Sequence, residues 1–149
     1  MNIALIGYGK MGHAIEEIAL QNGHEIVLRT SIENTEDMTA ENLQKADVAI
    51  EFTGPESAAD NLKKCFDTGI PVVCGSTGWL DKWEEIKKMC LSKQGALVYA
   101  SNFSIGVNLF FELNKYLSIL MKEYESYDVK MEEIHHTQKK MLRAEPQLH

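Results

Sequence analysis

The chain has 149 residues, which is one domain by length with room for a hydrophobic core. Its formal net charge of −7 argues against general binding to nucleic acid or to an anionic membrane, because both require a basic surface. No apolar run approaches membrane-spanning length, and the first residues lack the features of a signal peptide. The three cysteines (Cys65, Cys74 and Cys90) show no metal-type spacing and indicate reduced thiols in a cytoplasmic protein.

Short apolar runs alternate with helical patterns along most of the chain. Strands are predicted at 3–6, 25–29, 48–52, 70–74 and 96–99, and helices at 10–21, 55–68, 80–91 and 105–124. The polar stretch 30–44 is expected to be a loop with at most one helical turn. This alternation predicts βαβ units on a parallel sheet, an α/β fold. In the helix at 10–21, the expected apolar face consists of Met11, Ile15, Ile18 and Ala19.

The pattern changes after Ser126. Tyr127, Val129 and Met131 alternate with charged residues, which is typical of a half-exposed strand in an antiparallel sheet. We therefore expect a first domain at 1–125 and the first strand of a second, α+β domain at 126–149.

The first predicted strand ends in a glycine-rich loop, Gly7-Tyr8-Gly9-Lys10-Met11-Gly12, that opens a helix. In a G-x-G-x-x-G loop the first glycine allows a tight turn, the second lets a pyrophosphate approach, and the third permits close helix–strand packing. Free N–H groups at the helix start can then hold phosphates. The loop predicts a Rossmann-like dinucleotide-binding domain, with a plain tight turn as the alternative.

The residues after the second strand bear on the choice between NADH and NADPH. Ser31 or Arg29 falls where a carboxylate would grip a ribose 2′-hydroxyl, and an arginine there suits a 2′-phosphate. The sequence on this ground favours NADPH, while a solvated surface arginine remains an equal alternative.

Three further segments lie at carboxyl ends of predicted strands, where open α/β sheets bind ligands. They are Glu51-Phe52-Thr53-Gly54-Pro55, Gly75-Ser76-Thr77-Gly78 and Ser101-Asn102-Phe103-Ser104. Near the end of the chain, His135 and His136 are followed by Lys139. A nearby cation lowers a histidine pKa and suits it to proton transfer, with a solvated pair as the alternative. A zinc site is not expected, because no third ligand is apparent.

Together these motifs resemble dihydrodipicolinate reductase (4-hydroxy-tetrahydrodipicolinate reductase) of lysine and diaminopimelate biosynthesis. The resemblance covers residues 1–140 and is most specific in two segments, Ser101 to Asn108 and Glu133-Ile134-His135-His136-x-x-Lys139. It implies a cytoplasmic oxidoreductase, a homotetramer in the family, that reduces a cyclic imine dicarboxylate by hydride transfer from NADPH or NADH. The implied roles are catalytic for His135 and Lys139 and substrate-binding for His136. Cofactor binding is implied for Gly7, Tyr8, Gly9, Lys10, Met11, Gly12, Gly75, Ser76, Thr77, Ser101, Asn102, Phe103 and Ser104.

The family continues after the lysines with Asp-Ala-Pro-Ser-Gly-Thr-Ala, whereas residues 141–149 read Met-Leu-Arg-Ala-Glu-Pro-Gln-Leu-His. Back-translating from Lys140 as AAG ATG CTC CGA GCG GAA CCG CAA, and starting one base earlier, restores the family's segment. The hypothesis is a frameshift that leaves 141–149 as an out-of-frame tail and truncates the substrate domain. Genomic codons incompatible with that reading would contradict it. A chain truncated in this way is expected to lack reductase activity but to keep cofactor binding.

Two alternatives stay open at this stage. The first is another Rossmann dehydrogenase of the aspartate pathway, which the His-His-x-x-Lys segment disfavours. The second is a non-catalytic NAD(P)-binding module.

Overall fold

A computed structural model of the chain describes residues 1–130 and 132. The chain divides into two compact units, Met1–Asn108 and Leu109–His149. The first unit contains the whole sheet. The helix α5 (Ile105–Met121) runs across the division, and none of its residues is buried in the described part of the chain. The predicted domain boundary near residue 126 stays a prediction.

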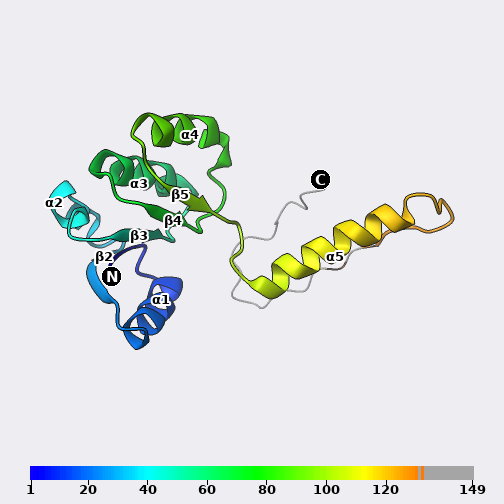
Figure 1. Cartoon of the computed structure of the whole chain (residues 1–149), viewed down its shortest axis with the longest axis horizontal. Helices are drawn as coiled ribbons and strands as arrows, with labels where there is room; N and C mark the ends of the chain where they lie inside the picture. The colour runs from blue at the N-terminus through cyan, green and yellow to red at the C-terminus, as the bar shows by residue number, and fades with distance from the viewer. Residues whose placement is uncertain (131, 133–149) are drawn as a thin grey trace. The chain divides into compact units, whose positions relative to one another are not determined.

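The first unit is built on one five-stranded parallel sheet in the order β2-β1-β3-β4-β5. The parallel sheet and the alternation of strands with helices confirm the predicted α/β, Rossmann-like class (Figure 1). The strands are β1 (Asn2–Ile6), β2 (Glu25–Thr30), β3 (Val48–Glu51), β4 (Val72–Cys74) and β5 (Leu97–Tyr99). The helices of this unit are α1 (Lys10–Gln21), α2 (Ala40–Leu43), α3 (Pro55–Thr68) and α4 (Trp83–Ser92).

Helices cover both faces of the sheet, as buried parallel strands require. On one face, Ala19 of α1 packs with Ile3 and Leu5 of β1. On the other face, side chains of α2, α3 and α4 join the larger core cluster, in which Leu62 and Ile86 are fully buried. Figure 1 shows α1 on one side of the strands and α3 with α4 on the other.

Local signals set the bounds of α3. Pro55 stands in its first turn, where a missing N–H costs nothing. Gly69 ends the helix in the left-handed region at φ 74°, and its N–H donates to the carbonyl of Phe66 at 3.2 Å. Because both signals can be seen in the sequence, the predicted range 55–68 is confirmed.

Some expectations were wrong in detail. The apolar face predicted for α1 included Met11 and Ile18, but these are 51% and 60% exposed. Its other two members, Ile15 and Ala19, pack with Ile3 and Leu5 of β1 as predicted, and Gly12 is also buried. The range 30–44 holds a 3₁₀ turn, η1 (Thr35–Asp37), as well as α2. The helix expected at 80–91 begins as a second 3₁₀ turn, η2 (Leu80–Lys82), and continues as α4.

The strand expected after Ser126 is not found in its described residues, 127–130 and 132. A strand exists only when its backbone groups pair with a neighbour, and the one described sheet consists of β1 to β5. Alternation of apolar and charged residues gives a segment one apolar face, but it does not provide the neighbouring strand that its backbone must pair with. Among the described residues, no helix is long and apolar enough to cross a membrane.

Phe66 of α3 is 1% exposed and sits in the larger core cluster. We expect Phe66→Ala to lower the free energy of unfolding by about 3–5 kcal/mol, because the loss of transfer energy is added to the cost of a cavity. Urea denaturation followed by circular dichroism measures the change. Ile32→Ala, at a side chain 96% exposed, is the control and should stay within about 0.5 kcal/mol of wild type. Equal effects of the two substitutions would contradict the assigned core.

Candidate active site at the carboxyl edge of the sheet

The strand order reverses between β1 and β3. The chain leaves β1 towards β2 on one side of the sheet, and β3 to β5 follow on the other side. Such a reversal opens a crevice at the carboxyl ends of the two central strands, where α/β proteins bind ligands. The two strand ends are tied directly, since the N–H of Phe52 donates to the carbonyl of Ile6 at 2.7 Å.

The glycine loop after β1 is held against the end of β2. The N–H groups of Gly7 and Tyr8 both donate to the carbonyl of Thr30, at 2.9 and 2.7 Å. Gly7 has φ 97°, and a Cβ on it would collide with the backbone carbonyl of Phe52. A Cβ on Gly12 would lie 2.6 Å from the carbonyl oxygen of Gly7. These two glycines are therefore required by packing, as the motif predicts.

Gly9 differs from its two partners, because a Cβ on it would meet nothing within 4 Å. Gly9 is also the N-cap of α1, and its residue type supplies no side-chain cap. Neither does the first turn of α1 carry an acidic residue. The first N–H groups of the helix thus lack a side-chain cap, and the positive end of the helix dipole favours an anion there. This arrangement suits a phosphate group.

Glu51 ends β3 and is fully buried, yet its carboxylate is well supplied with donors. Its Oε1 accepts hydrogen bonds from the backbone N–H of Thr53 at 3.2 Å, from the Thr53 hydroxyl, and from Asn61 Nδ2 at 3.4 Å. Its Oε2 accepts from the thiol of Cys74 on β4 at 3.1 Å. One buried carboxylate thereby connects the end of β3 to α3 and β4.

The loop after β4 packs against the loop after β3. The Oγ of Ser76 accepts a hydrogen bond from the N–H of Thr53 at 2.8 Å. A Cβ on Gly75 would collide with the ring of Phe52, so glycine is needed for this close approach. The Phe52 ring lies 6.3 Å, centroid to centroid, from that of Phe103 in the turn after β5.

The turn that follows β5 is ordered by its own polar groups. Asn102 Oδ1 accepts from the N–H of Ser104 at 2.8 Å. The side-chain amide of Asn108 donates to the carbonyls of Asn102 and Ser104, at 3.0 and 2.8 Å. Ser101 to Ser104 are exposed at the edge that carries the glycine loop and the Gly75 turn.

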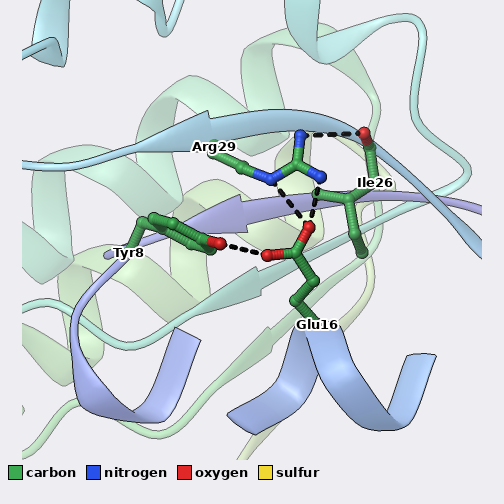
Figure 2. A network of polar contacts seen from close by, with 4 residues as sticks. All are labelled: Tyr8, Glu16, Ile26 and Arg29. Atoms are coloured by element: carbon green, nitrogen blue, oxygen red, sulfur yellow. Dashed lines mark hydrogen bonds and ion pairs between the residues drawn. The ribbon is translucent and has the colours of Figure 1, made fainter. Parts of the chain in front are cut away.

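A polar network that sequence reasoning missed joins this loop to α1 and β2 (Figure 2). Glu16 accepts hydrogen bonds from Arg29 Nε, at 2.9 Å, and from Arg29 Nη2 on one oxygen, and from the Tyr8 hydroxyl on the other. The hydrogen bonds from Arg29, then that from Tyr8, lower the pKa of Glu16. The hydrogen bond to Glu16 raises the pKa of Tyr8 and of Arg29. Arg29, whose side chain is 41% exposed, is thus paired with Glu16 at the surface.

The structure brings the predicted cofactor segments to one edge of the sheet, namely Gly7 to Gly12, Gly75 to Thr77 and Ser101 to Ser104. His135, His136 and Lys139 lie outside the described residues. No cluster of three or more potential metal ligands occurs within 1–130 and 132. Sequence reasoning missed the pair of Glu16 and Arg29. Its only signal in the sequence was the presence of opposite charges on α1 and β2, which the βαβ connection places side by side.

Comparison with known sequences decides the family. A family model described as "Dihydrodipicolinate reductase, N-terminus" matches residues 1–103. The chain belongs to the dihydrodipicolinate reductase family. A 4-hydroxy-tetrahydrodipicolinate reductase of Christiangramia forsetii is 48% identical over 141 residues, covering 93% of this chain and 57% of the relative. The enzyme of Neisseria meningitidis is 33% identical over 124 residues, covering 83% of this chain and 45% of the relative. The chain therefore spans about half the length of these reductases.

Solved structures share the fold at low identity. An archaeal homoserine dehydrogenase in complex with NADPH has a TM-score of 0.53 at 15% identity, over 66% of this chain and 43% of that one. A putative oxidoreductase from Klebsiella pneumoniae has a TM-score of 0.52 at 22% identity, over 66% and 34%. These similarities show the fold alone, and they support the Rossmann-like class predicted for this chain.

Glu51→Gln tests the buried carboxylate. In the variant, the amide nitrogen of glutamine would face a group that now donates a hydrogen bond to Glu51, so that hydrogen bond would be lost. We therefore expect the free energy of unfolding to fall by about 1–3 kcal/mol. Chemical denaturation measures it. Glu41→Gln is the control, since the Glu41 side chain is 86% exposed and lies 3.9 Å from Lys45, a pair that contributes little. A variant Glu51→Gln as stable as wild type would show that the network does not hold the loops.

Burial raises the pKa of both the Cys65 and Cys74 thiols to about 12, so neither forms the reactive thiolate near neutrality. We expect iodoacetamide at pH 8 to modify the partly exposed Cys90 first and to leave the other two intact. Peptide mass spectrometry identifies the sites, and the same reaction in urea should label all three. Labelling of Cys74 in the native protein as fast as Cys90 would contradict its burial.

Proposed function

We propose that this chain is the cofactor-binding part of a 4-hydroxy-tetrahydrodipicolinate reductase and that it binds NADH or NADPH at the carboxyl edge of its sheet. The observation that carries the proposal is the glycine loop, with Gly7 and Gly12 locked by packing and Gly9 open above a helix start without a side-chain cap. The family match supplies the reaction class.

The residues present fit a dinucleotide. Backbone N–H groups at Gly9 and the first turn of α1 would hold the pyrophosphate, with Lys10 and Met11 following in that turn. The Gly75-Ser76-Thr77 turn and the Ser101 to Ser104 segment would line the path of the nicotinamide along the strand ends. When bound, the nicotinamide cofactor supplies a hydride to the substrate.

The remaining roles are proposals based on the family resemblance. His135 and Lys139 would handle the proton that accompanies reduction, and His136 would contact a cyclic imine dicarboxylate. The whole enzyme would work in the cytoplasm and assemble as a homotetramer. The homoserine dehydrogenases share only the fold, so another dehydrogenase of the aspartate pathway is not favoured.

Binding of NADH and NADPH to the 149-residue chain, measured by calorimetry, tests the cofactor site. We expect both to bind, and Gly9→Val to weaken both by about tenfold or more, because the side chain fills the space where the pyrophosphate approaches the backbone. Unchanged circular dichroism would show that the variant folds.

Ala40→Val, at an exposed residue of α2, is the control for the added side chain and should leave affinity unchanged. Failure of the wild-type chain to bind either cofactor would overturn the proposed function.

A further inference from the structure

Arg29 lies where it bears on recognition of the cofactor's ribose. It is the second-last residue of β2, and the carbonyl of its neighbour Thr30 receives the two N–H groups of the glycine loop. Its guanidinium carbon lies 5.9 Å from the centroid of the Tyr8 ring, within that loop. An arginine at the end of this strand is the usual ligand for the 2′-phosphate that distinguishes NADPH from NADH.

The guanidinium is already engaged, however (Figure 2). Two of its nitrogens donate to one oxygen of Glu16, and Nη1 donates to the carbonyl of Ile26 at 3.3 Å. The second Glu16 oxygen is taken by the Tyr8 hydroxyl. Charge-assisted hydrogen bonds of this kind hold a guanidinium in one direction.

The other candidate at this strand end is engaged as well. Ser31 donates to Asn34 Oδ1 through its backbone N–H at 2.7 Å and through its hydroxyl at 3.0 Å. The same hydroxyl accepts from the N–H of Glu33 at 3.1 Å. Residues 29–31 therefore offer neither a free carboxylate for a 2′-hydroxyl nor a free guanidinium for a 2′-phosphate.

Resting on the proposed cofactor site, we propose that Glu16 is a specificity-determining residue, which holds Arg29 away from a 2′-phosphate and so removes the preference for NADPH. A 2′-phosphate that recruited Arg29 would leave the Glu16 carboxylate, whose side chain is only 15% exposed, without its cation and next to a like charge. The free energy lost when Arg29 leaves Glu16 offsets the free energy gained when it binds the 2′-phosphate. The chain consequently uses NADH and NADPH with similar affinity.

The decisive experiment compares Glu16→Gln with Glu17→Gln by calorimetry with NADH and NADPH. Both variants remove one negative charge from α1, but the carboxylate of Glu17 accepts only a weak hydrogen bond from Gln21, at 3.4 Å. We expect Glu16→Gln to raise the affinity for NADPH relative to NADH about tenfold, because Arg29 is released, and Glu17→Gln to leave the ratio unchanged. Equal effects of the two variants would overturn the proposal.

A second substitution keeps the test valid if Glu16→Gln does not fold. Glu16→Ala, which also removes the carboxylate, should likewise raise the affinity for NADPH relative to NADH about tenfold, because it too releases Arg29. A ratio within about twofold of wild type in every folded Glu16 variant would show that Glu16 does not hold Arg29 away from the phosphate and would overturn the proposal.

Adding Arg29→Met to Glu16→Gln should abolish the rise in NADPH affinity relative to NADH. If the wild type binds neither cofactor, the proposed function itself fails. If it binds both and the ratio never responds, only this inference fails.

Discussion

The candidate site depends on the close approach of the carboxyl ends of β1 and β3. Gly7 packs directly against the backbone of Phe52, where no side chain could fit, and its positive φ turns the chain back towards Thr30. That turn sets the direction in which α1 begins. The helix therefore begins at the carboxyl edge of the sheet, at the point where the strand order reverses.

The buried carboxylate of Glu51 is a second constraint on the same edge of the sheet. Burial of the Glu51 carboxylate is costly unless its oxygens are satisfied, and its donors come from the loop after β3, from α3 and from β4. Satisfying one buried group therefore fixes three elements relative to one another. The cost of burial is offset by preorganisation, because Thr53 and Ser76 are held at the edge before any ligand arrives.

The sequence predicted most of what local chemistry determines. The bounds of α1 and α3 agree with the structure because a glycine loop, Pro55 and Gly69 mark them within a few residues. What it missed depends on distant partners. Ile18 is exposed because the sheet covers only a narrow stripe of α1, and the strand expected after Ser126 has no pairing neighbour among the described residues. The His135 segment lies outside the described residues, so its role rests on resemblance.

The pairing of Glu16 with Arg29 shows why residue type at a motif position is a weak guide to specificity. The two residues are 13 positions apart and meet only because the connection from α1 to β2 lays the helix across the strand. An arginine near a ribose site is read as a phosphate ligand when its partners are unknown. A carboxylate that reaches it first competes with the phosphate for the same fork of donors. Specificity is then a difference between two ion pairs, and it is set by a residue that need not touch the cofactor.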